Sequence, residues 1–77
     1  MIKVLLFAQL QEEIGERTLM LEADHSTVKQ VKEYLQQQYP HALFQAAIAA
    51  VNEEYAYDGD AVKDGDIVAF LPPVSGG

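Results

Sequence analysis

The residues best suited to chemistry are the last two, Gly76 and Gly77. Two residues without side chains can pass through a channel too narrow for any other pair, and they leave the terminal carboxylate unhindered. They follow a rigid Pro72-Pro73 spacer, which a frayed chain end does not need. Fully extended, residues 72–77 reach at most ~20 Å. We therefore predict a protruding tail that delivers the Gly77 carboxylate into a neighbouring protein. The tail residues expected to enter the channel of that protein are Gly76, Ser75, Val74, Pro73 and Pro72.

Four aspartates, Asp58, Asp60, Asp64 and Asp66, stand close together in the sequence. A calcium-binding EF-hand loop needs oxygen ligands at alternate positions and a glutamate at its twelfth position, and this spacing supplies neither. Aspartate-glycine pairs are common in turns, because aspartate hydrogen-bonds to nearby backbone and glycine accepts turn conformations. We expect turns here and no metal site.

The histidines and the other glycines supply no second candidate site. His25 and His41 do not form a ligand pair such as i and i+4 on one helix, and the chain has no cysteine to complete a zinc site. We expect both histidines to cap a helix or to face solvent. Gly59 and Gly65 lack the strand-loop-helix context and the lysine of a phosphate-binding loop. The sequence thus predicts no cofactor bound by this chain, ATP included.

The composition restricts the possible functions further. The chain has 77 residues, of which 49% are hydrophobic and 22% charged, as is typical of one small globular domain. Its formal net charge of -7 would be repelled by nucleic-acid phosphates and by anionic lipid headgroups, so we expect neither as a partner. A partner steered by electrostatics would present a basic face. The first residues do not resemble a signal peptide, and we expect a cytoplasmic protein.

The tail needs a folded body to hold it, and an alternating pattern predicts the first strand of that body. Even-numbered apolar residues from Ile2 to Leu6 indicate that residues 1–8 form a strand whose even positions face the core. Leu5 and Phe7 then lie on the opposite face. Exposed apolar side chains commonly mark a surface that binds a partner.

The middle of the chain predicts one main helix. Thr27 and Gln30 have the spacing of a capping box at its start, and Pro40 ends it because the residue before a proline is disfavoured in helical geometry. Apolar residues at i, i+3, i+7 and i+11 form a single stripe for the core. The stripe consists of Val28, Val31, Leu35 and Tyr39.

Shorter segments give the predicted order of strand, strand, helix, strand, short strand, strand. Turn residues bound these segments, and the connector after Pro40 carries no specific signal. The last strand could face either way; we favour Leu71 outward, because Val68 and Phe70 fill a core better than their neighbours do. The remaining segments are a short helical turn at 9–14 and strands at 17–22, 47–51, 55–57 and 66–71.

Three motifs add a family resemblance: the opening Ile2-Lys3-Val4-Leu5-Leu6-Phe7-Ala8, the run Asp64-Gly65-Asp66-Ile67-Val68, and the closing Ala69-Phe70-Leu71-Pro72-Pro73-Val74-Ser75-Gly76-Gly77. With the order of elements, they resemble the ubiquitin-like β-grasp sulfur carriers, and more narrowly the small subunits of molybdopterin synthases. The resemblance covers essentially the whole chain. It implies an α+β fold with a β-grasp domain over residues 1–71, in which a mixed sheet of four to five strands packs on one main helix. A flexible Gly-Gly tail follows over residues 72–77.

The resemblance also implies a chemistry for the tail. A carboxylate is a poor electrophile at neutral pH, so an ATP-dependent activating enzyme would adenylate Gly77, and sulfur from a persulfide donor would displace AMP to leave a thiocarboxylate. The tail would then enter the large synthase subunit, where two such carriers supply the dithiolene sulfurs of molybdopterin to a cyclic phosphate precursor. The chain would be a non-catalytic sulfur donor in a heterotetramer. Phe7, Leu71 and Tyr55 are implied as docking residues, and the basic substrate pocket is expected to belong to the large subunit.

Other functions remain open at this point. Sulfur carriers for the thiazole of thiamine also end in Gly-Gly, although the Pro72-Pro73-Val74 spacer favours molybdopterin. A ubiquitin-like modifier would attach Gly77 to lysines of target proteins. An ordinary interaction module would not need Gly76 and Gly77 at all.

Overall fold

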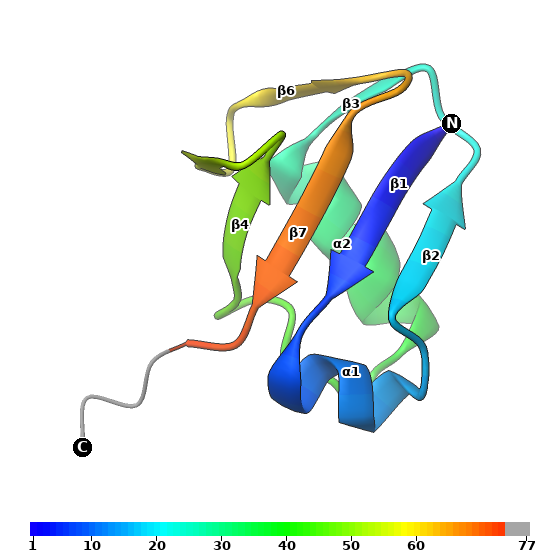
Figure 1. Cartoon of the computed structure of the whole chain (residues 1–77), viewed down its shortest axis with the longest axis vertical. Coiled ribbons are helices and arrows are strands. Elements are labelled where there is room, and N and C mark those ends of the chain that lie inside the picture. The colour runs from blue at the N-terminus through cyan, green and yellow to red at the C-terminus, as the bar shows by residue number, and fades with distance from the viewer. Residues whose placement is uncertain (74–77) are drawn as a thin grey trace.

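The computed structural model describes residues 1–73, which form seven strands and two helices. Figure 1 shows a twisted sheet with the long helix α2 against one face and the short helix α1 at one end, near the chain's exit from the sheet. Four residues of the predicted tail, including Gly77, whose carboxylate is the predicted reaction site, lie outside the described residues: Val74, Ser75, Gly76 and Gly77. The elements are β1 (Ile2–Leu6), α1 (Ala8–Ile14), β2 (Thr18–Leu21), β3 (His25–Thr27), α2 (Val28–Gln38), β4 (Ile48–Val51), β5 (Glu54–Ala56), β6 (Ala61–Lys63) and β7 (Ile67–Leu71).

Five of the strands form one mixed sheet in the order β2-β1-β7-β4-β5. The first and last strands, β1 and β7, run parallel at its centre, with Val4 opposite Val68. The pairs β1 with β2, β7 with β4, and β4 with β5 are antiparallel. A mixed five-stranded sheet packed on one main helix is the β-grasp fold, which confirms the predicted fold class.

Two short strands were not expected from the sequence. β3 and β6 pair with each other in a separate two-stranded ribbon, with Ser26 opposite Val62. The predicted order of elements is therefore incomplete, because a strand belongs between the first strand pair and the helix and another precedes the last strand. Three residues are too few to display an alternating pattern, so only the pairing across the chain reveals these strands.

The core lies between the sheet and α2. Ile2, Val4 and Leu6 are almost fully buried, and so are Val68 and Phe70 in β7. The predicted apolar stripe also faces the core. Its three members on α2, Val28, Val31 and Leu35, are buried, and Tyr39, directly after the helix, is partly buried against the core. Since fully burying one such side chain contributes ~1.5–3 kcal/mol relative to exposure, this layer holds the domain together.

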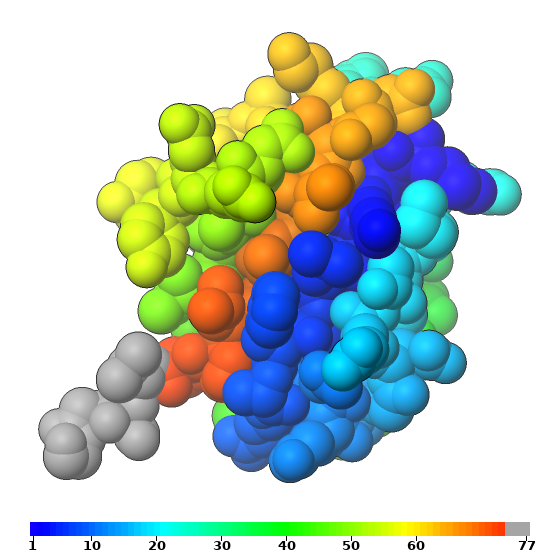
Figure 2. Space-filling view, in the orientation of Figure 1, coloured from blue at the N-terminus to red at the C-terminus, as the bar shows by residue number. Residues whose placement is uncertain are grey.

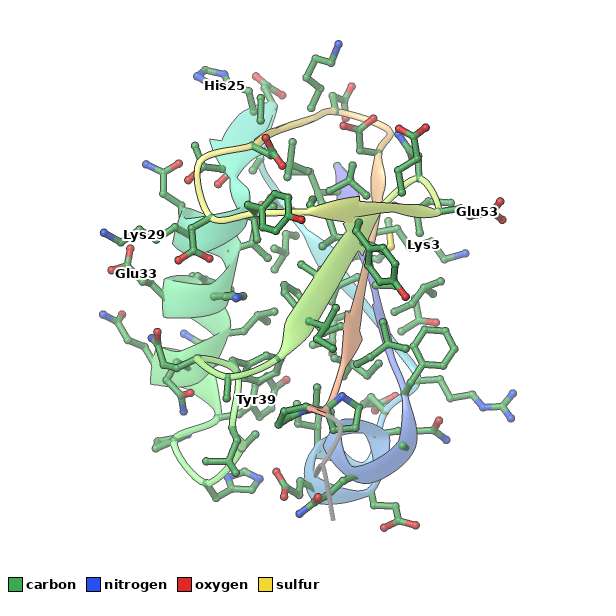
Figure 3. The ribbon with its side chains drawn as sticks, turned by 90° about the vertical axis from the view of Figure 1, so that its left-hand side faces the viewer. Lys3, His25, Lys29, Glu33, Tyr39 and Glu53 are labelled. Carbon is green, nitrogen blue, oxygen red and sulfur yellow. The ribbon has the colours of Figure 1, made fainter. Side chains whose placement is uncertain are left out.

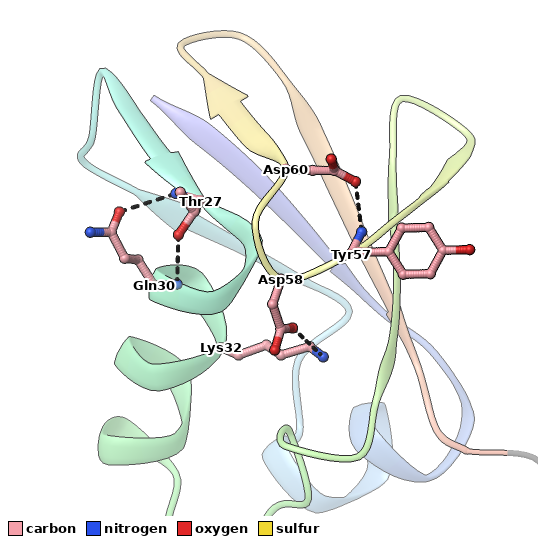
Figure 4. Close-up of polar contacts among 6 residues, drawn as sticks. All are labelled: Thr27, Gln30, Lys32, Tyr57, Asp58 and Asp60. Atoms are coloured by element: carbon pink, nitrogen blue, oxygen red, sulfur yellow. Dashed lines mark hydrogen bonds and ion pairs between the residues drawn. The ribbon is translucent and has the colours of Figure 1, made fainter.

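Both ends of α2 agree with the sequence. The Thr27 hydroxyl accepts the Gln30 backbone N–H at 3.2 Å, and the Gln30 side chain accepts the Thr27 N–H at 3.1 Å, so the capping box is present (Figure 4). The helix ends with Tyr39 as its C-cap, directly before Pro40. The first helix is also confirmed and starts one residue earlier than predicted, and Gly15 caps it in the left-handed conformation at φ 83°.

The connector at residues 40–46 packs into the core, although no pattern in its residues indicated this. Ala42 and Phe44 are fully buried in the core, and the Phe44 ring meets the Phe70 ring edge-on at a centroid distance of 5.7 Å. Gln36 on α2 holds this segment, because its amide nitrogen donates to the Ala42 carbonyl at 2.7 Å and its oxygen accepts the Phe44 N–H at 3.0 Å. The connector is thus part of the core.

Candidate docking face and tail root

The face of the sheet opposite α2 carries apolar side chains from four strands and from Phe7, which follows β1. Strand register places Leu5 opposite Ala69 and Ala69 opposite Ala50, so these three residues form a row across the sheet centre. Tyr55 extends this row from β5, since it pairs with Ala50. We call the apolar residues that these four strands place on this face, together with Phe7, the outer-face patch; it consists of Leu5, Phe7, Ile48, Ala50, Tyr55, Ile67, Ala69 and Leu71.

The outer-face patch includes the three residues expected to bind a partner. Phe7 is 43% exposed, Leu71 is 37% exposed and Tyr55 is 78% exposed. Leu71 faces outward as favoured from the sequence, since its neighbour Phe70 is buried. These exposures make a docking role possible for the three residues, while the role itself stays a prediction. Figure 2 shows this side of the molecule, with β1 and β7 side chains meeting at its centre.

Two further members of the patch, Ile48 and Ile67, were not among the residues expected to bind a partner. Both are large exposed hydrophobic residues, and Ile48 lies opposite Leu71 in the register. Residues 47–51 are apolar at every position, so no alternation indicated which side chains face outward. For Ile67, the expected outward position of Leu71 implied the same face four residues earlier, because side chains two and four residues apart in a strand lie on one face, and this parity was the available signal.

A shallow hollow lies within the patch beside the β4–β5 turn. It is lined by Leu5, Phe7, Ile67 and Ala69 and, at its rim, by Asn52 and Glu53. Asn52 holds the turn in place, because its backbone N–H donates to the Ile67 carbonyl at 2.8 Å and its side-chain oxygen accepts the Ile67 N–H at 3.0 Å. Figure 3 shows Glu53 and Lys3 projecting from the side of the sheet opposite α2. The hollow therefore combines apolar walls with one charged residue, Glu53, in its lining.

The tail begins where the patch ends. β7 stops at Leu71, after which Pro72 is partly buried and Pro73 is exposed. These two prolines line a second shallow hollow, whose other walls come from α1 and the connector: Gln9, Leu10, Glu13 and Leu43. Prolines restrict the backbone before any partner binds. The described part of the spacer thus leaves the sheet directly after Leu71, a member of the outer-face patch.

The four aspartates serve turns and contacts between segments. Asp60 accepts the Tyr57 N–H at 2.7 Å, and Asp58 pairs with Lys32 at 3.3 Å (Figure 4). Asp64 pairs with the amino group of Met1. Within residues 1–73, no group of three or more histidine, cysteine or acidic side chains is arranged to hold a metal ion.

Hydrogen-bond donors from two segments surround the Asp66 carboxylate. Its carboxylate accepts the Lys63 backbone N–H at 2.8 Å and the Asn52 side-chain amide at 3.0 Å. These donors stabilise the charged form, so the pKa of Asp66 lies below its ordinary value of 3.8, with the Lys63 hydrogen bond as the largest cause. This carboxylate fixes the start of β7 and the turn that carries Glu53.

The two histidines lie apart and make no ligand pair. His25 is exposed on β3 (Figure 3), consistent with the solvated role expected for it. His41 is also exposed, and its Nε2 atom lies 2.8 Å from the Glu13 carbonyl oxygen, which links the connector to α1. Among residues 1–73, neither helix is long and apolar enough to cross a membrane.

The fold and the site together define a β-grasp domain with an exposed apolar sheet face beside the residues that lead to a Gly-Gly end. Comparison with known families gives the same class, because residues 4–77 match the ThiS family model. The chain belongs to the ThiS family.

Individual relatives agree with this assignment. A Haemophilus influenzae protein named molybdopterin synthase sulfur carrier subunit is 41% identical over an alignment that covers 100% of both chains. An Escherichia coli protein of the same name is 40% identical, again with 100% of both chains covered. Among solved structures, the crystal structure of SAMP1 from Haloferax volcanii has a TM-score of 0.79 and 32% identity, covering 99% of this chain and 98% of the other. The family resemblance drawn from the sequence is confirmed.

Proposed function

We propose that this chain is the sulfur carrier subunit of a molybdopterin synthase and works in molybdenum cofactor biosynthesis. The observation that carries the proposal is the full-length similarity, at 41% identity, to a relative with that name. The apolar face beside the exit of the tail supports it, because a carrier must dock while its end reaches into a second protein. The Gly76-Gly77 end and the Pro72-Pro73 spacer meet the remaining requirements of such a carrier.

The proposed chemistry takes place on the carboxylate of Gly77. An oxygen of this carboxylate attacks the α-phosphorus of ATP on an activating enzyme and releases pyrophosphate, which converts a poor electrophile into an acyl adenylate. A persulfide sulfur then attacks the acyl carbon and displaces AMP. A second thiol then attacks the donor's sulfur and forms a disulfide with it, which breaks the sulfur–sulfur bond to the acyl group and leaves sulfur on Gly77 as a thiocarboxylate. In this scheme the chain binds no cofactor, and ATP is bound by the activating enzyme.

Two protein partners follow from this scheme. The activating enzyme loads the tail, and the large synthase subunit accepts it and holds the phosphate-containing precursor. The net charge of -7 disfavours binding of an anionic precursor by this chain, so the basic pocket is assigned to the large subunit. We place these reactions in the cytoplasm, where the activation step finds its ATP.

The test is the intact mass of the chain after incubation with an activating enzyme, ATP and a persulfide donor. Replacement of one terminal oxygen by sulfur adds about 16 Da, so fragment ions must assign the change to Gly77 and exclude oxidation of a methionine. A matched variant that lacks residues 76 and 77 should stay unchanged. An unmodified carboxylate in the complete reaction would contradict the carrier function.

A protein-modifier function is the second candidate, and one observation favours it. The chain is 32% identical over nearly its full length to SAMP1, and a second structure from the same organism is described as small archaeal modifier protein 1. A modifier would leave Gly-Gly remnants on lysines of target proteins after proteolysis. Mass spectrometry of cell lysate for these remnants separates the two functions, because a carrier used only for sulfur transfer leaves none.

A further inference from the structure

Glu53 occupies an unusual backbone conformation beside the outer-face hollow. Its φ is 71° and that of Asn52 is 50°, both in the left-handed region. Asparagine tolerates this region, whereas glycine is the residue that normally occupies the second position of such a turn. A glutamate in this conformation lowers the folding stability relative to a glycine. A binding role of its side chain would account for its presence there.

The side chain of Glu53 has no ionic partner within the described part of the chain. The ion pairs found among residues 1–73 join Met1 to Asp64 and Lys32 to Asp58. Lys3 projects from the same side of the sheet (Figure 3), yet it forms no ion pair with Glu53. The carboxylate at the rim of the hollow is thus available to a group from outside.

The hollow has the chemistry that suits a long cationic side chain. Leu5, Phe7 and Ile67 offer apolar walls to an aliphatic stem, and Glu53 offers a carboxylate to its charged end. The exposed Phe7 ring can also pack against a planar guanidinium group. An arginine satisfies all three features, whereas an apolar side chain would leave the carboxylate unpaired.

We propose that the hollow lined by Leu5, Phe7, Ile67 and Glu53 receives an arginine side chain of the large synthase subunit. This inference rests on the proposed function, because it takes the large subunit as the protein that docks on the outer-face patch. Two observations favour that occupant: the hollow is continuous with the patch beside the tail root, and this chain carries a net charge of -7. A basic docking face is the electrostatic complement of such a surface.

The experiment compares the affinity of four full-length proteins for the large subunit by calorimetry: wild type, Glu53→Gln, Glu53→Gly and Glu54→Gln. Glu54 is the matched control, because it is the next residue, is exposed and does not line the hollow. Glu53→Gln and Glu54→Gln change the net charge equally, so general electrostatic steering affects them alike. We expect Kd to rise at least about fivefold in both Glu53 variants and less than about twofold in Glu54→Gln.

The dependence of binding on ionic strength and the urea concentration of unfolding are two further measurements. Both distinguish loss of the Glu53 carboxylate from a general loss of structure. Binding of Glu53→Gln should depend less on ionic strength than binding of the wild type. Glu53→Gly should unfold at a higher urea concentration than the wild type, because glycine relieves the backbone strain, while it binds more weakly.

The outcomes separate this inference from the proposed function. Equal affinity of Glu53→Gln and wild type, or equal weakening by Glu53→Gln and Glu54→Gln, would overturn the arginine site while leaving the carrier function intact. If the wild type itself accepts no sulfur and does not bind the large subunit, the proposed function fails and the arginine site fails with it.

Discussion

Asn52 and Asp66 show how two side chains can join separate turns near the docking face. The Asn52 amide donates to Asp66, and its oxygen accepts the Ile67 N–H, so both polar atoms of one amide group are used at 3.0 Å. Asp66 also accepts the Lys63 N–H at 2.8 Å. Through these bonds, the turn that carries Glu53 is fixed to the first residue of β7.

Asp66 should make stability depend on pH. Its pKa is lowered in the folded chain by the donors from Lys63 and Asn52, so its stabilising effect is present above the ordinary value of 3.8 and is lost as pH falls through the lower folded value. Asp66→Asn removes this titration. Urea unfolding of both proteins at pH 7 and at about pH 2.5 should show a smaller loss of stability on acidification in the variant. Equal losses would show that Asp66 does not contribute to the acid sensitivity.

Gln36 links α2 to the connector, and removing its amide should cost stability. Gln36→Leu would leave the Ala42 carbonyl and the Phe44 N–H without their present partners. Each unsatisfied buried polar group costs ~1–3 kcal/mol, so we expect a loss of about 1–3 kcal/mol or more in the free energy of unfolding. Denaturant unfolding measures it. Gln37→Leu is the control, since Gln37 is exposed and should change stability by less than about 0.5 kcal/mol.

At the scale of elements, the sequence predicted those features that depend only on residues within one helix or strand. The alternation in β1 gave the buried and exposed sides correctly, although the strand ends at Leu6 and not at residue 8. Phe7, the N-cap of α1, still lines the outer-face hollow as its position in the pattern indicated. The spacing of Thr27 and Gln30 gave the start of α2. Both signals arise from residues within one element.

Features that depend on contacts between distant segments could not be predicted in this way. The ribbon of β3 and β6 exists because residues 25–27 meet residues 61–63 across the chain. Phe44 is buried because it meets Phe70, and its neighbours give no periodic pattern. At the candidate site, Glu53 stands in a polar turn like many surface glutamates, and its relation to the hollow required the register of β1, β7 and β4.

The connector should therefore tolerate substitution far less than its sequence suggests. Phe44→Ala removes a fully buried ring that packs on Phe70, and such a truncation costs about 3–5 kcal/mol. Domains of this size have only ~5–15 kcal/mol of stability in total, so the variant should be partly unfolded or melt at a much lower temperature. Gln45→Ala, at an exposed neighbour, should melt like the wild type. A small effect of Phe44→Ala on thermal unfolding would contradict the assignment of the connector to the core.

At the scale of the whole molecule, the two faces of the sheet differ in what covers them. One face is covered by α2 and holds the core, and the other leaves apolar side chains exposed (Figures 1 and 2). The chain leaves β7 at the same end as α1, whereas the N-terminus lies at the opposite end of the sheet (Figure 1). Docking through the open face thus presents the tail root to the same partner that covers the patch.

Phe7→Asp should weaken binding to the large subunit while the domain stays folded. Phe7 is 43% exposed and follows β1 outside the core, so a charge there disturbs the docking face and little of the packing. Loss of a central aromatic contact in an interface costs ~2 kcal/mol or more, equivalent to a rise in Kd of about 30-fold. Calorimetry measures the affinity, and circular dichroism melting verifies the fold.

Tyr34→Asp is the matched control for that experiment. Tyr34 is an equally large aromatic residue, is 50% exposed and lies on α2, on the side of the sheet away from the outer-face patch. The same charge is added in both variants, so a general electrostatic effect would appear in both. If only Phe7→Asp binds weakly, the partner docks on the open face; if Tyr34→Asp loses affinity and Phe7→Asp does not, the partner covers α2 and the docking assignment is wrong. The open face is the expected answer because Leu71, the last residue of β7, belongs to it, and a partner seated there meets the tail as it leaves the sheet.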